Sequence, residues 1–158
     1  MGLDVGPLVG LRVGDVVGLR VGPSVGDILG GAVGWSVGRS VGGFVGAVMR
    51  YAVINWVQYA LHTSTLPYGT LTVNVIGCLV IGLLGGLSES RNLLTAETRA
   101  LLLIGVLGGF TTFSTVGYET VQLLRDGESL TAFSNIGLQV CLGLVAVWIG
   151  YSVSQVGT

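Results

Sequence analysis

Four long apolar stretches dominate this chain of 158 residues. They run from about 32 to 61, 68 to 87, 100 to 124 and 131 to 153, and a membrane-spanning helix needs about 20 such residues. Only 9% of the residues are charged and the mean hydropathy is +0.82, whereas soluble domains carry about 25% charged residues. The sequence therefore predicts an all-α integral membrane protein with four transmembrane helices joined by short connections.

The remaining composition argues against several classes of protein. The net charge is −1 and all seven basic residues are arginine, so the chain lacks the basic surface that nucleic-acid binding requires. Cys78 and Cys141 both lie inside apolar runs and are expected to be small hydrophobic side chains. His62 stands alone in the first connection. Because the sequence shows no catalytic triad, paired carboxylates, phosphate-binding loop or metal-ligand cluster, we predict that the chain is not an enzyme.

The N-terminal part is a tandem repeat in which Val-Gly recurs every four residues, from Val5-Gly6 to Val45-Gly46 with one break at Leu29-Gly30. A four-residue step drifts by about 40° per repeat on a helix, and each interior glycine costs about 1 kcal/mol. We interpret residues 1–31 as a low-complexity extension, poorly ordered or marginally helical, before a four-helix domain at 32–153 and a short tail at 154–158. The alternative is a helix-packing surface, because small residues four apart let helices approach closely.

Arginines in the connections set the expected orientation of a membrane protein. Arg91 and Arg99 lie in the second connection and Arg125 in the third, on opposite sides of the membrane, so the bias amounts to about one charge. So weak a bias permits insertion in both orientations. This property is typical of small proteins that assemble as antiparallel dimers.

The octet at 108–115, with sequence Gly-Gly-Phe-Thr-Thr-Phe-Ser-Thr, interrupts the third apolar stretch. Glycine loosens a helix, and Thr and Ser compete for backbone hydrogen bonds. Non-helical backbone at membrane depth is tolerated only where protein buries it or where it lines a polar cavity. We therefore predict that the third helix is broken at this octet.

Two polar residues in the first and second stretches are candidates for function. The charged side chain of Arg50 costs free energy inside a membrane. Either it extends to the interface, or it supplies a positive charge that attracts an anion or caps a helix C-terminus. Asn74 shares a helix face with Thr70, four residues earlier. Its amide either bonds neighbouring helices together or offers two donors to an anion in a pore. The sequence leaves both pairs of alternatives open.

Phe113 and Glu119 are the candidates in the third stretch. Phe113 either packs as an ordinary aromatic or turns its electropositive ring edge to a small anion. Glu119 is the only acid inside a predicted span. It is either a proton or coupling-ion site, or an acceptor that holds the broken helix together. We favour the acceptor, because the other spans contain no companion acid.

Three motifs occur in order along the chain: Gly42-Gly43-x-x-Gly46-Ala47-x-x-Arg50-Tyr51, Gly69-Thr70-Leu71-x-x-Asn74-x-x-Gly77 and Gly108-Gly109-x-Thr111-Thr112-Phe113-Ser114-Thr115. A looser fourth is Gly143-Leu144-x-Ala146-x-Trp148-x-Gly150. With these motifs, residues 32–153 resemble the Fluc-type fluoride channels of the CrcB family.

This resemblance implies a fluoride-specific channel of the cell membrane that lowers cytoplasmic fluoride by passive export. Family members are antiparallel, dual-topology homodimers with two pores along the interface and a structural sodium ion at the centre. By motif, the backbone carbonyls of Gly108 and Thr111 would bind the sodium, and Arg50 would lie at the vestibule. Fluoride would pass near the polar and aromatic positions Thr70, Asn74, Phe113, Ser114, Thr115, Val116, Asn135 and Gln139.

The chain departs from the family pattern at three of these positions. The second pore phenylalanine falls on Val116, and the hydroxyl-bearing track of the fourth helix falls on Asn135 and Gln139. One alternative is therefore the non-conducting half of a heterodimeric fluoride channel. Another is a small antiparallel four-helix exporter of drugs or cations, although that class needs a central acid early in the chain and Glu119 lies in the third span.

Overall fold

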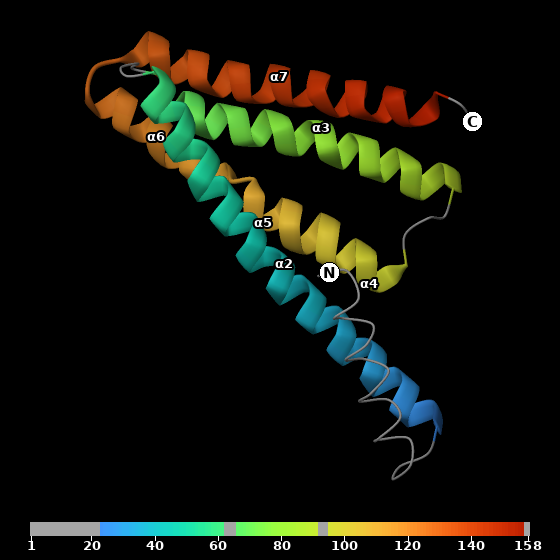
Figure 1. The fold of residues 1–158 in the computed structure, drawn as a ribbon. Coiled ribbons are helices and arrows are strands. Elements are labelled where there is room, and N and C mark those ends of the chain that lie inside the picture. The colour runs from blue at the N-terminus through green and yellow to red at the C-terminus, as the bar shows by residue number, and fades with distance from the viewer. Residues whose placement is uncertain (1–22, 62–65, 92–94, 157–158) are drawn as a thin grey trace. The chain divides into compact units, whose positions relative to one another are not determined.

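The computed structural model describes residues 23–61, 66–91 and 95–156 (Figure 1). All regular elements in this part of the chain are helical. In chain order they are α2 (Pro23–Leu61), α3 (Tyr68–Arg91), α4 (Ala96–Arg99), the π-helix η1 (Ala100–Leu107), α5 (Gly108–Phe110), α6 (Phe113–Arg125) and α7 (Ser129–Gln155).

The prediction of four helices long and apolar enough to cross a membrane is confirmed. The segments are Gly31–Leu61, Tyr68–Ser88, Ala100–Arg125 and Ser129–Gln155, each within a few residues of the predicted bounds. Continuous apolar runs of this length fix such spans without knowledge of the packing. The helix α2 itself begins earlier, at Pro23. Residues 1–22, which make up most of the predicted extension, lie outside the described residues.

The chain forms two compact units, Met1–Gly46 with Leu93–Gly109, and Ala47–Asn92 with Phe110–Thr158. In the first unit the backbones of α2 and η1 touch. A Cβ atom at Gly42 would overlap the carbonyl oxygen of Leu101, and one at Gly105 would lie 2.9 Å from the carbonyl of Arg39. Gly42 lies beyond residue 31, in the continuation of the Val-Gly repeat, and its small size permits this close approach.

In the second unit, α3 and α7 lie side by side along their lengths (Figure 1). Here too glycines allow the close approach: a Cβ at Gly82 would overlap the Val147 carbonyl, and one at Gly150 would overlap the Leu79 carbonyl. The side of α7 that faces this contact carries a buried stripe at helical spacing, made of Ala132, Asn135, Gly143, Ala146, Gly150 and Ser154.

A tight turn joins α6 to α7 in the second unit. Gly127 adopts a φ of 80°, its N–H donates to the Leu124 carbonyl at 3.2 Å, and the Glu128 N–H donates to the Leu123 carbonyl at 2.8 Å. This pair of bonds is the Schellman arrangement, which ends a helix and satisfies its last carbonyls. The turn brings the start of α7 back against α6, so that polar side chains from both helices can meet.

Thr111 and Thr112 are not helical, and they separate α5 from α6. Thr112 is extended, with φ −153° and ψ 117°, and its side chain accepts a hydrogen bond from the Thr115 N–H at 3.3 Å. Thr112 is therefore the N-cap of α6, a position that threonine favours because its oxygen satisfies a free N–H of the first turn. The π-helical geometry of η1 was not predicted.

Candidate functional site

Polar side chains from α3, α6 and α7 meet inside the second unit, next to the interruption at Thr111 and Thr112. Most of them are buried or half-buried, which in a membrane protein requires hydrogen-bond partners. We call this set the polar cluster: Thr70, Asn74, Thr112, Glu119, Thr120, Asn135 and Gln139.

Asn74 holds the peptide groups of Thr112 from both sides. Its Oδ1 accepts from the Thr112 N–H at 2.9 Å, and its Nδ2 donates to the Thr112 carbonyl at 3.1 Å and to Gln139 Oε1 at 3.0 Å. A carboxamide has two N–H donors, so both donors of Asn74 are engaged within the chain. The geometry matches the first of the two interpretations of Asn74, as a bond between helices.

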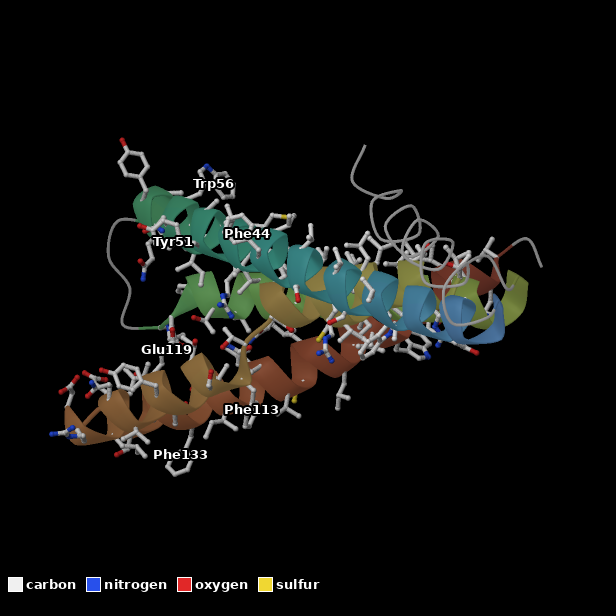
Figure 2. The ribbon with its side chains drawn as sticks, turned by 90° about the horizontal axis from the view of Figure 1, so that it is seen from below. Phe44, Tyr51, Trp56, Phe113, Glu119 and Phe133 are labelled. Atoms are coloured by element: carbon white, nitrogen blue, oxygen red, sulfur yellow. The ribbon has the colours of Figure 1, made fainter. Side chains whose placement is uncertain are left out.

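Glu119 is joined to α3 through Thr70. The Thr70 hydroxyl donates to Glu119 Oε1 at 2.5 Å, and Thr70 is almost completely buried. Figure 2 shows Glu119 on the same α6 helix as Phe113. The carboxylate thus accepts a hydrogen bond that ties α6 to α3. Its other oxygen, Oε2, is buried and has no hydrogen-bond partner among the described residues.

Asn135 pairs with a residue that the sequence reasoning missed. Its Nδ2 donates to the Thr120 hydroxyl at 3.1 Å, and only 1% of Asn135 is exposed. This bond ties α6 to α7. One turn further along α7, Gln139 Nε2 is buried without a hydrogen-bond partner in the described part of the chain. The two α7 positions of the predicted polar track therefore both lie in the cluster.

The first turn of α6 carries a second group of hydroxyls. The Thr112 hydroxyl lies 3.2 Å from Ser114 Oγ and 2.9 Å from Thr115 Oγ1. Thr112 connects this group to Asn74, because the same residue bonds the Asn74 amide through its backbone. Ser114 and Thr115, both predicted as pore positions, are thus adjacent to the polar cluster.

Arg50 reaches the interruption from α2. Its Nη1 donates to the Thr111 carbonyl at 3.4 Å, and its side chain is half-buried. Thr111 directly follows the last residue of α5, so the guanidinium lies at the negative end of a helical segment. Of the alternatives for Arg50, this contact matches capping of a helix C-terminus.

Phe113 and Val116 differ sharply in exposure. Phe113 is 86% exposed, whereas Val116 is only 5% exposed. Val116 is thus part of the core of the second unit. The exposed ring of Phe113 is left for a partner or for lipid to cover.

Thr112 and Thr120 were not among the predicted site residues. The sequence did contain a signal for Thr112, because a threonine followed by a helix with free N–H groups is a common N-cap. Thr120 forms a buried stripe on α6 with Val116 and Leu123, at the helical spacing of four and three residues. The spacing alone does not reveal that Asn135 is its partner.

Comparison with known proteins decides the family. The family described as "CrcB-like protein, Camphor Resistance (CrcB)" matches residues 38–151, which include the whole polar cluster. The chain belongs to the CrcB family. The matched region starts within α2 and leaves the first part of the Val-Gly repeat outside.

Relatives in the CrcB family are identical to the chain at close to half of the aligned residues. The protein of Geobacter metallireducens is 48% identical over 101 residues, covering 64% of this chain and 81% of the relative. That of Nitrosococcus oceani is 44% identical over 107 residues, covering 68% and 85%. That of Geobacter sulfurreducens is 49% identical over 103 residues, covering 65% and 82%. All three are named "Fluoride-specific ion channel FluC".

Proposed function

We propose that this protein is a fluoride-specific channel of the cell membrane that lets fluoride leave the cytoplasm passively. The observation that carries the proposal is its membership of the CrcB family together with the naming of its relatives as fluoride-specific channels. Four helices long enough to cross a membrane support it. A negative-inside potential would drive anions outward, by about 2.3 kcal/mol per 100 mV.

The polar groups of the second unit suit a small, strongly hydrated anion. Fluoride gives up water only where the pore offers replacement donors, and it must bind weakly enough to leave again. Because both N–H groups of Asn74 are engaged, the donors left for an anion are the hydroxyls of Ser114 and Thr115, the ring edge of Phe113 and the amide of Gln139, whose Nε2 has no partner among the described residues. We propose that fluoride passes along these groups.

We propose that the channel is an antiparallel homodimer with subunits in both orientations. The arginine bias of about one charge between the connections permits both insertions. Phe113 is 86% exposed on the single chain, and a pore that uses its ring edge needs a second wall. A second copy of the chain would supply that wall on each side of the dimer.

We also propose that the interruption at Thr111 and Thr112 is a functional break in the third span, and that the carbonyls of Gly108 and Thr111 hold a structural sodium. Unwound carbonyls and half-helix C-termini are typical sodium ligands in membrane proteins. The backbone at Gly108 suits this role. In a continuous helix the Thr112 N–H would donate to the Gly108 carbonyl, whereas here it donates to Asn74. Bound sodium would supply positive charge that offsets the desolvation of nearby anions.

Fluoride efflux from liposomes tests the proposal. Purified protein in vesicles loaded with potassium fluoride, with valinomycin to carry the balancing charge, should release fluoride, and vesicles loaded with chloride should release little. Removal of the exposed ring in Phe113→Ala should slow the efflux, whereas Phe133→Ala, at an exposed aromatic of α7 (Figure 2), should not.

Absence of fluoride efflux from well-folded protein would refute the proposal of a homodimeric channel and favour the alternative of a subunit from a heterodimeric channel. Efflux that depends on a proton gradient and is lost in Glu119→Gln would instead favour the exporter.

A further inference from the structure

Arg39 is an exposed charged residue on an apolar part of α2, and the proposed channel makes no use of it. Its guanidinium lies 4.5 Å from the centroid of the Trp35 ring, about one turn earlier on the same helix. Both side chains are exposed. Side chains on a helix lean toward its N-terminus, so the arginine extends over the indole toward the beginning of α2.

Two serines lie beside this pair. Ser36 and Ser40 are both exposed, and Ser40 Oγ donates to the Ser36 carbonyl at 3.0 Å. Within residues 31–49 these serines and Arg39 are the only side chains with a hydroxyl or a charge. We call the set of Trp35, Ser36, Arg39 and Ser40 the arginine patch.

The packing of α2 on η1 places the arginine patch near the start of the third span. A Cβ at Gly42 would overlap the Leu101 carbonyl, and one at Gly105 would lie 2.9 Å from the Arg39 carbonyl. The third span begins at Ala100, and all these residues belong to the first compact unit. The patch therefore lies close to the depth at which the neighbouring helix enters the apolar part of the membrane.

A second exposed aromatic pair lies further along α2. Trp56 (Figure 2) and Tyr59 are both exposed, and they follow Trp35 and Arg39 by 21 and 20 residues of the same helix. With a rise of about 1.5 Å per residue the two pairs are about 30 Å apart along α2, which is the thickness of the hydrocarbon core. Trp and Tyr concentrate at the two membrane–water interfaces, so the two pairs mark both surfaces of the membrane on this helix.

The other arginine of α2 agrees with this placement. Arg50 lies eleven residues after Arg39 and nine before Tyr59, near the middle of the membrane. It is half-buried and donates to the Thr111 carbonyl at 3.4 Å. A charge at the centre of a membrane needs such a partner within the protein, whereas one at the surface can meet lipid headgroups and water.

We propose that the arginine patch binds the phosphate of a lipid headgroup. A guanidinium presents its N–H donors in a planar fork that matches phosphate oxygens, and stacking on Trp35 holds that plane in one orientation. Val41 and Val45 are exposed on the membrane side of the patch, where they would contact the acyl chains of the same lipid. The part of α2 before the patch, residues 23–34, then lies outside the hydrocarbon core.

Native mass spectrometry of the full chain in detergent tests this proposal. Wild type, Arg39→Gln and Arg39→Lys are titrated with dioleoylphosphatidylglycerol, and with dioleoylglycerol as a lipid that has the same chains but no phosphate. Arg125→Gln is the matched control, because Arg125 is an exposed arginine in the last turn of α6 and its removal changes the net charge equally.

The proposal predicts that Arg39→Gln weakens binding of the first phosphatidylglycerol about fivefold, the effect of one arginine near an anionic surface. Arg39→Lys, which keeps the charge but loses the planar fork, should weaken it about twofold. Arg125→Gln should leave this first binding step unchanged, and dioleoylglycerol should bind all four proteins equally. An excess of inorganic phosphate should not displace the phospholipid.

A second measurement reports the depth of the patch without altering it. Trp56→Phe and Trp148→Phe together leave Trp35 as the only tryptophan. In vesicles of phosphatidylcholine brominated at different positions of the acyl chain, its fluorescence should be quenched most by the bromines nearest the headgroup.

Three results would overturn the proposal. Equal losses in Arg39→Gln and Arg125→Gln would mean general charge attraction and no site. Displacement of the lipid by inorganic phosphate would mean a site for a free anion. Strongest quenching of Trp35 by bromines at the bilayer centre would place the patch away from the surface. None of these measurements involves fluoride, so the channel proposal survives or fails independently of them.

Discussion

Replacement of Asn74 by leucine is the most informative single test of how the interruption is held. The change keeps a branched side chain of similar size but removes three hydrogen bonds, two to the Thr112 backbone and one to Gln139. Hydrogen bonds between helices in membrane proteins average about 0.6 kcal/mol each, which gives about 2 kcal/mol. The Thr112 N–H and carbonyl also lose their partners in a buried site, and each unsatisfied group costs about 1 kcal/mol or more.

We therefore expect Asn74→Leu to lower the free energy of unfolding by about 4 kcal/mol, measured by denaturant titration in micelles with circular dichroism. Asn55→Leu is the matched control. Asn55 is exposed on α2, and its Nδ2 bonds the Tyr51 carbonyl of its own helix at 2.7 Å, so its loss should cost about 0.5 kcal/mol or less. Equal losses in the two variants would refute the role of Asn74 as the clamp of the interruption.

Two further substitutions test contacts of the second unit. Gly77→Ala should lower the free energy of unfolding by about 1 to 3 kcal/mol, because its Cβ would overlap the Thr111 methyl group. In the control variant Gly137→Ala, the added Cβ meets nothing within 4 Å and should cost no stability. Equal effects of the two substitutions would contradict this packing. Thr120→Val and Asn135→Leu should show a coupling energy of about 0.6 to 1.7 kcal/mol in a double-mutant cycle, and strictly additive losses would contradict the 3.1 Å bond between these residues.

The sequence predicted the spans well and the contacts of its polar residues poorly, and the reason is physical. A span is defined by a local property, the length of an apolar run, so the bounds of Gly31–Leu61 and Ser129–Gln155 follow from composition. The role of Asn74 depends on which groups lie opposite it once α3, α6 and α7 have packed. Sequence spacing gives the face of a helix but neither the partner helix nor its axial position.

Arg50 and Val116 illustrate the same limit. The alternatives for Arg50 differ only in what surrounds the guanidinium, which the sequence does not give; in the structure its Nη1 contacts the Thr111 carbonyl. For Val116, the motif predicts a position at the pore, and on the single chain the side chain is only 5% exposed. The pore assignments themselves remain predictions, because they depend on the proposed dimer.

The partners of the interrupted backbone come from different parts of one chain. Non-helical peptide groups at membrane depth need replacement partners: Arg50 on α2 bonds the Thr111 carbonyl, Asn74 on α3 bonds both sides of Thr112, and the Thr112 hydroxyl caps α6. Each bond lies within the second compact unit. The contacts of a single chain are therefore enough to hold these two residues outside the helix.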